Sequence, residues 1–146
     1  MKAILQLTRI AFGFFAATVI APFAVHFLSR LLPWQPEVPY TSFREFLTIA
    51  SVDWLFFTEA LALPALIAIL VAEIFKLRSA AFYILAGAAI GLLFTGWLRS
   101  ISHSLDLSGA PAQGAVEGGI VLFAGALGAL AYWRFAGKFS GMWRER

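Results

Sequence analysis

The chain has 146 residues, of which 61% are hydrophobic and 13% are charged. An ordinary soluble domain is roughly 45–50% apolar and about 25% charged, so this chain has too few polar side chains to cover a surface in water. The sequence therefore predicts an all-α integral membrane protein. The net charge of +3 comes from Lys and Arg residues beside hydrophobic runs, so no nucleic-acid partner is expected. The absence of cysteine excludes thiolate metal sites and cysteine nucleophiles.

The first hydrophobic run, residues 10–28, is long enough to cross a hydrocarbon core of roughly 30 Å as a helix. A cleaved signal peptide is the alternative, because Lys2 and Arg9 precede the run. The run exceeds the roughly 7–15 apolar residues of a signal peptide and lacks a small-residue cleavage site, which favours a membrane span. Three prolines between Pro33 and Pro39 then end the helix.

A short amphipathic helix is expected between the first and second spans. Ser42 and Glu45 form a capping-box pattern at its start. Apolar residues at helical spacing then alternate with polar ones, which favours a helix lying on the membrane surface. A loop helix packed over the bundle is the alternative. The apolar positions are Phe43, Phe46, Leu47 and Ala50.

Three more hydrophobic runs follow, at residues 54–75, 80–98 and 116–133. Pro64 lies in the middle of the second span, where it is expected to kink the helix. The turn between the second and third spans is so short that these helices must be antiparallel neighbours, and Glu73 is expected to pair with Lys76 there. The whole chain, residues 1–146, is thus predicted to be a single domain with four transmembrane helices in an up-down bundle.

The distribution of Lys and Arg predicts the orientation. Eight lie in the N-terminus, in the turn between the second and third spans, and in the tail at residues 134–146. Three lie in the loop between the first and second spans and in the loop between the third and fourth. The positive-inside rule places both termini in the cytoplasm, which in a bacterium means an inner-membrane protein. The tail mixes basic and aromatic residues and is interpreted as a lipid anchor that attracts anionic headgroups; a docking peptide for a cytosolic partner is the alternative. The anchor residues are Arg134, Lys138, Trp143 and Arg144.

Small residues recur at four-residue spacing in the third and fourth spans, a pattern that lets transmembrane helices approach closely. We expect these seams to join the two helices to each other or to a second copy of the chain. A glycine-lined conduit is the alternative. The residues are Gly87, Gly91 and Thr95 in the third span and Ala124, Gly125, Gly128 and Ala129 in the fourth.

Ionisable residues inside a membrane span are costly and require a partner or a role. Glu59 is the deepest of those expected on the outer side, and Arg99 and Glu117 lie at matching depth. These three residues are predicted to form either a salt bridge that locks three helices or a site where Glu59 exchanges protons or ions. A further polar site on the outer face is predicted from four residues: His26, Asp53, His103 and Asp106.

The candidate polar residues match no known chemical motif. Their spacing differs from that of dense metal-binding motifs, and the serine-rich loop around His103 has no nucleophile elbow. No catalytic residue, metal or cofactor is therefore expected. These features predict a non-enzymatic accessory protein, scaffold or oligomeric membrane component that binds lipid or a membrane partner. A small oligomeric transporter or channel that uses Glu59 is the alternative, and an enzyme acting on a lipid-linked substrate is the third hypothesis.

Overall fold

The computed structural model describes residues 2–31, 42–104 and 111–142. These residues form four long helices and one short 3-10 turn, η1, and they contain no strand. All four long helices are long and apolar enough to cross a membrane, which indicates an integral membrane protein. The elements are α1 (Lys2–Leu31), α2 (Phe43–Phe75), α3 (Ala80–Ser104), α4 (Pro111–Phe135) and η1 (Gly137–Phe139).

The helices extend beyond the hydrophobic runs that predicted them. The largest difference is in α2, whose first residues were expected to form a separate surface helix. Ser42 caps α2 by accepting a hydrogen bond from the Glu45 backbone N–H at 3.2 Å, and the helix then continues without a break to Phe75. At its other end Lys76 takes a left-handed conformation with a φ of 54° and stops the helix.

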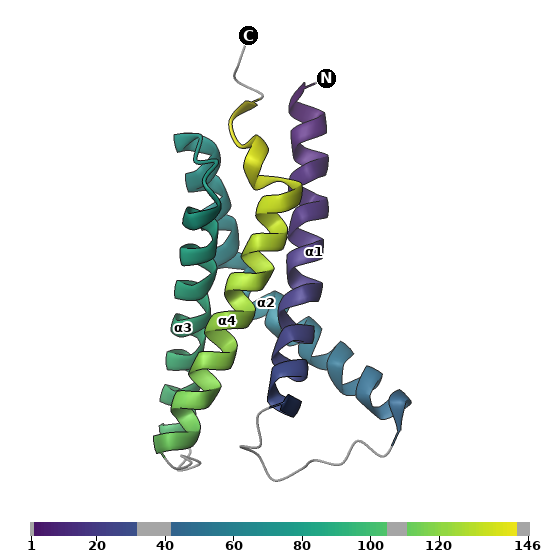
Figure 1. The fold of residues 1–146 in the computed structure, drawn as a ribbon, viewed down its shortest axis with the longest axis vertical. Coiled ribbons are helices and arrows are strands. Elements are labelled where there is room, and N and C mark those ends of the chain that lie inside the picture. Colours follow the sequence, from purple (N-terminus) through teal and green to yellow (C-terminus); the bar gives the residue numbers. More distant parts are fainter. Residues whose placement is uncertain (1, 32–41, 105–110, 143–146) are drawn as a thin grey trace.

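Helix α4 lies between α1 and α3 and packs closely on both, whereas α2 touches α1 and α3 only sparsely (Figure 1). The first half of α2 slants away from the other helices in Figure 1. Pro64 lies near its middle, where a missing N–H weakens the helix. The start of α1, the turn between α2 and α3, and the end of α4 share one end of the molecule (Figure 1), which we call the terminal end; the opposite end is the loop end.

The contact between α3 and α4 depends on glycine. A Cβ atom added to Gly87 would collide with the backbone oxygen of Gly125, and one added to Gly91 would lie 2.7 Å from the backbone oxygen of Val121. The two backbones therefore touch directly, and close contact over small residues is what holds helices together in lipid. Thr95 completes this side of α3: its side chain is buried and its hydroxyl donates to the Gly91 carbonyl at 2.9 Å.

The opposite side of α4 packs on α1. A Cβ atom added to Gly128 would lie 3.0 Å from the Cβ atom of Ala21 and 3.1 Å from the Ala17 carbonyl oxygen. The small residues of α4 therefore serve two neighbours, since Ala129 faces Gly87 on α3 whereas Gly128 faces α1. Ala124 is 1% exposed, so α4 is the centre of a layer of three helices.

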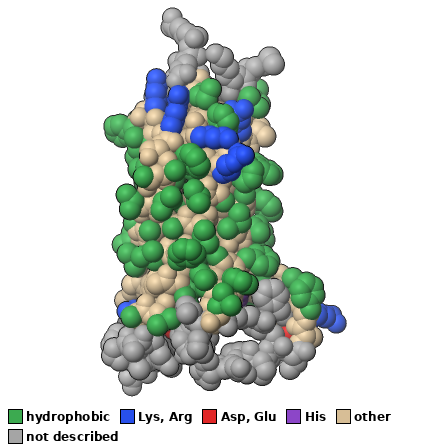
Figure 2. Space-filling model, viewed as in Figure 1, with side chains coloured by type: hydrophobic (Ala, Val, Ile, Leu, Met, Phe, Trp, Pro, Cys, Tyr) green, Lys and Arg blue, Asp and Glu red, His purple; other side chains and the backbone are tan. Residues whose placement is uncertain are grey.

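The surface of the molecule is dominated by apolar side chains. Leu63, Leu85 and Leu93 are 68%, 69% and 71% exposed on two different helices. Figure 2 shows hydrophobic side chains along the length of the visible face, with Lys and Arg side chains gathered at the terminal end. An apolar surface of this extent is suited to contact with lipid.

Replacing Gly87 by alanine should destabilise the protein by about 1–3 kcal/mol, because the new Cβ atom would push α3 away from α4. Gly96→Ala is the matched control: it lies on the same helix, and an added Cβ atom there has no neighbouring atom within 4 Å. This control should leave stability unchanged or raise it by a fraction of a kcal/mol. Thermal unfolding in detergent measures both; equal midpoints for the two variants would contradict the close contact.

Candidate functional site

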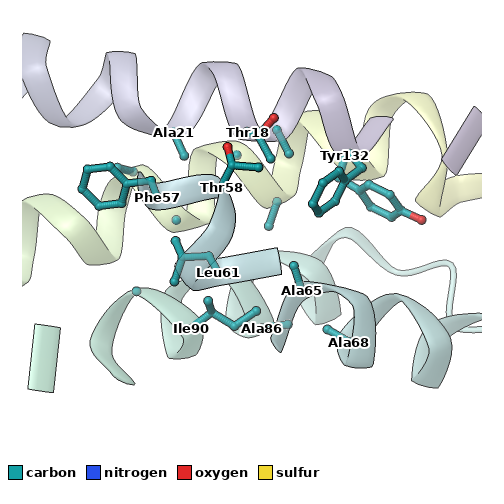
Figure 3. A pocket seen from close by; sticks show the side chains of 18 of the residues that line it. Thr18, Ala21, Phe57, Thr58, Leu61, Ala65, Ala68, Ala86, Ile90 and Tyr132 are labelled. Atoms are coloured by element: carbon teal, nitrogen blue, oxygen red, sulfur yellow. The ribbon is translucent and has the colours of Figure 1, made fainter. Parts of the chain in front are cut away.

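A cavity of about 130 Å³ lies between α2 and the layer formed by α1, α4 and α3 (Figure 3). Helix α2 presents Ala62, Ala65 and Ala68 to this space, and the facing helices present alanine and glycine. Small side chains on both sides leave the space between the helices unfilled. Because α2 contacts α1 and α3 only sparsely, the cavity is enclosed least tightly along these two edges.

The lining of the cavity is almost entirely apolar. Among the described residues that line it, the polar side-chain atoms are hydroxyl oxygens, and no side chain carries a charge. The Thr18 hydroxyl donates to the Phe15 carbonyl at 2.9 Å. The buried hydroxyls of Thr58 and Tyr132 have no hydrogen-bond partner in the part of the chain that the structure describes. The cavity therefore offers space for apolar atoms and no ionic contact.

Two tyrosines close the cavity toward the terminal end. The rings of Tyr83 and Tyr132 lie 5.5 Å apart and pack with Ile69 and Ala136 in the buried core. Figure 3 shows Tyr132 at one end of the cavity and Phe57 at the other. Tyr83 and Tyr132 therefore separate the cavity from the terminal end.

A buried carboxylate lies at the terminal end of α2. Glu73 is 8% exposed. Its Oε1 accepts a hydrogen bond from Nε2 of Gln6 at 2.7 Å, and its Oε2 accepts one from the backbone N–H of Gly141 at 2.9 Å. Gly141 has a φ of 73°, a conformation that glycine adopts without strain. Glu73 thus joins α1, α2 and the segment that follows α4.

A second set of hydrogen bonds holds the same segment. Ser140 is fully buried, and its Oγ lies 2.6 Å from the Tyr83 hydroxyl. Its carbonyl accepts a hydrogen bond from Nε of Arg78 at 3.0 Å, and Nε1 of Trp133 donates to the Arg78 carbonyl at 2.8 Å. We call the contacts made by Gln6, Glu73, Tyr83, Arg78, Ser140 and Gly141 the terminal network.

The terminal network differs from the pairing expected from the sequence. Glu73 was expected to pair locally with Lys76, whereas its carboxylate bonds to Gln6 and Gly141 and the Lys76 side chain is exposed. One signal was present in the sequence. Gln6 and Glu73 are polar residues near the same end of two apolar helices, where interhelical hydrogen bonds between side chains are favoured.

The structure describes all three residues of the predicted Glu59 cluster. Glu59 is exposed on α2 and is not among the described residues that line the cavity. Arg99 is exposed on α3, and Glu117 is half-buried on α4. Between these three described side chains the structure gives no ion pair. Their joint role therefore stays a prediction.

The second predicted polar site lies partly outside the described residues. His26 is partly buried near the loop end of α1. Asp53 belongs to α2 and His103 to α3, but their side chains are not among those described, and Asp106 lies outside the described residues altogether. In the described ranges, no three His, Asp or Glu side chains gather closely enough to hold a metal ion.

The predicted anchor residues lie at the terminal end as far as the structure describes them. Arg134 is exposed in the last turn of α4, and Lys138 is half-buried in η1. Trp143 and Arg144 fall outside the described residues.

No family model matches the chain, and no curated protein or solved structure matches it either. The chemistry of the cavity and of the terminal end is therefore the basis for inferring what the protein binds. The cavity is lined by apolar side chains, whereas the terminal end presents cationic side chains.

Glu73→Gln should destabilise the protein by about 1–3 kcal/mol, because a neutral amide replaces the carboxylate that accepts two buried hydrogen bonds, and hydrogen bonds to a charged acceptor are the stronger ones. Glu59→Gln is the matched control, since Glu59 is exposed on the same helix and should show no loss of stability. Thermal unfolding in the same detergent compares the two. If Glu59→Gln were the more damaging change, the terminal network would not be the main polar contact of α2.

Proposed function

We propose that this protein is a non-enzymatic membrane component that binds the apolar chain of a membrane lipid in the cavity beside α2. The observation that carries this proposal is the cavity of about 130 Å³, lined by apolar side chains from all four helices. Its least enclosed edges lie between α2 and its two neighbours, so a chain can enter sideways from the surrounding lipid.

The energetics favour a chain in the cavity over an empty space. Inside a bilayer the hydrophobic effect adds little, and binding depends on dispersion contacts with groups that would otherwise have no partner atoms. An engineered apolar cavity of about 150 Å³ in another protein stays dry and binds benzene. A cavity of about 130 Å³ therefore has room for a short segment of a hydrocarbon chain.

The lining supports binding rather than chemistry or transport. The described lining residues include no acid, base or charged nucleophile, so the cavity has no group suited to general acid–base catalysis. Transport through Glu59, the alternative function, has less support because the Glu59 side chain is exposed and lies outside the cavity lining. A passive binding role in a scaffold or oligomer fits these features best.

The same proposal includes a membrane orientation. With four spans in an up-down bundle, the terminal end faces the cytoplasm, because Lys and Arg are concentrated there, and a bacterial inner membrane is the expected location. The exposed first turns of α2, from Phe43 onward, lie at the opposite membrane surface. The lipid-facing surface is then available for a second copy of the chain or a larger membrane complex.

Filling the cavity should weaken the binding of a lipid chain there. Ala65→Leu places a larger side chain in the lining of the cavity. The probe is a phosphatidylcholine that carries a photoreactive diazirine in its acyl chain. The substitution should reduce, several-fold, the crosslinking of this lipid to the peptides that face the cavity. The measurement is mass spectrometry of peptides after crosslinking in nanodiscs. Ala89→Leu makes the same change at an exposed position on α3 and serves as the control.

The distribution of crosslinks decides the result. In the unchanged protein we expect crosslinks at cavity-facing residues such as Leu61 and Ala68 in addition to the exposed leucines. Crosslinks confined to exposed residues such as Leu63 and Leu93 would overturn the proposal, as would equal labelling of the cavity in the Ala65→Leu and Ala89→Leu variants.

A further inference from the structure

Two cationic side chains share one aromatic ring at the terminal end. The Cζ atom of Arg9 lies 4.0 Å from the centroid of the Phe139 ring, and the Nζ atom of Lys138 lies 4.9 Å from the same centroid. Arg9 belongs to α1, whereas Lys138 and Phe139 belong to η1. The fold thus brings two positive charges from opposite ends of the chain to one aromatic ring.

These two cations have unused hydrogen-bond donors. Stacking on a ring face leaves the N–H groups at the edge of a guanidinium free, and within the described residues neither Arg9 nor Lys138 donates a hydrogen bond or forms an ion pair. Of the described residues at this end, only Glu73 is acidic, and its carboxylate is buried in the terminal network. Among the described residues, the exposed charge at this end is therefore positive.

The surroundings of the two cations are apolar toward the middle of the molecule. Phe12 and Phe135 are 56% and 40% exposed, and their rings meet edge to face at 5.1 Å on the surface of α1 and α4. Arg9 and Phe12 are three residues apart on α1, so they lie on neighbouring turns of one side of the helix. A basic group next to an exposed aromatic surface matches the arrangement of a phospholipid, whose phosphate lies above its acyl chains. An acidic soluble peptide would leave this aromatic surface uncovered.

We propose that Arg9 and Lys138, held on Phe139, form a binding site for the phosphate of an anionic phospholipid. The guanidinium of Arg9 presents paired N–H donors to phosphate oxygens, and the ammonium of Lys138 adds a second charge. This site is separate from the cavity, which Tyr83 and Tyr132 close toward the terminal end.

The terminal network positions the site. Glu73 on α2 accepts the Gly141 N–H, and Tyr83 on α3 bonds to Ser140, so the segment that carries Lys138 and Phe139 is held against α2 and α3. Glu73 also accepts a hydrogen bond from Gln6 on α1, which connects the segment to the helix that carries Arg9. Glu73 and Tyr83 are therefore positioning residues. Loss of either hydrogen bond should loosen the segment and move Phe139 and Lys138 away from Arg9.

The site is tested by lipid retention in native mass spectrometry, with the full chain offered equal amounts of phosphatidylglycerol and phosphatidylcholine in detergent. We expect the unchanged protein to retain phosphatidylglycerol preferentially. The double variant Arg9→Gln/Lys138→Gln should weaken that retention on the order of tenfold. The control Arg44→Gln/Arg99→Gln removes the same charge from exposed positions near the other end of the molecule and should leave the preference unchanged.

If Glu73 positions the site, Glu73→Gln should change the retention of anionic lipid in the direction opposite to that expected from charge alone. Glu73→Gln removes a negative charge, which by Coulomb's law would strengthen the binding of an anionic lipid. If Glu73 positions the site, Glu73→Gln weakens retention instead. Tyr83→Phe should do the same without any change in charge, and it keeps the test valid if Glu73→Gln fails to fold.

Three outcomes would overturn the proposal. The first is equal loss of preference in the double variant and its control, which would indicate a general effect of charge. The second is unchanged retention in Tyr83→Phe together with stronger retention in Glu73→Gln. The third is complete displacement of phosphatidylglycerol by an equal concentration of inorganic phosphate, which would indicate a site for the free anion. A failure of acyl-chain crosslinking in the cavity leaves these outcomes unaffected.

Discussion

Direct backbone contact between α3 and α4 is the constraint on which the rest of the structure depends. Side chains larger than hydrogen at Gly87 and Gly125 would separate these helices, and in lipid no hydrophobic force would push them back together. The same helix α4 meets α1 over Gly128 and Ala17. Three helices therefore form a tight layer whose cohesion comes from dispersion contacts and close approach.

The fourth helix, α2, cannot join this layer in the same way. It faces the layer with alanines such as Ala65 and Ala68, which are too small to fill the space in front of them, and its first half leaves the bundle (Figure 1). The cavity therefore forms because small residues face each other where α2 does not approach its neighbours closely. Small residues thus have two effects: they let α3 and α4 pack closely, and they leave space unfilled beside α2.

Glu73 connects α2 to two other parts of the molecule through buried hydrogen bonds. A carboxylate near lipid is costly unless it is hydrogen-bonded, and this one accepts bonds from α1 through Gln6 and from the end of the chain through Gly141. The terminal end is therefore held by polar contacts, whereas the first half of α2 slants away from the other helices (Figure 1). The basic surface lies at the terminal end, and the apolar cavity lies farther along the molecule.

Local features of the chain were sufficient to predict its helices. Hydrophobic runs of the right length identified all four membrane-spanning candidates, and the Ser42–Glu45 pattern located the start of α2. These features depend on neighbouring residues and on solvent, so they can be recognised without a fold. The predicted break between a surface helix and the second span did not appear, because nothing in residues 43–54 interrupts helical hydrogen bonding.

The contacts that suggest function are of a different kind. Glu73 lies 67 residues from Gln6 and 68 from Gly141, and Arg9 meets Phe139 across nearly the whole chain. Such pairings depend on the rotation and depth of each helix, which the packing of α4 against its two neighbours decides. By itself, the amino-acid sequence determined that the protein has four apolar helices and a basic end, because hydropathy and charge are local properties. Only the tertiary structure decided which polar residues meet and where the space between helices remains, because both depend on how side chains from distant segments fit together.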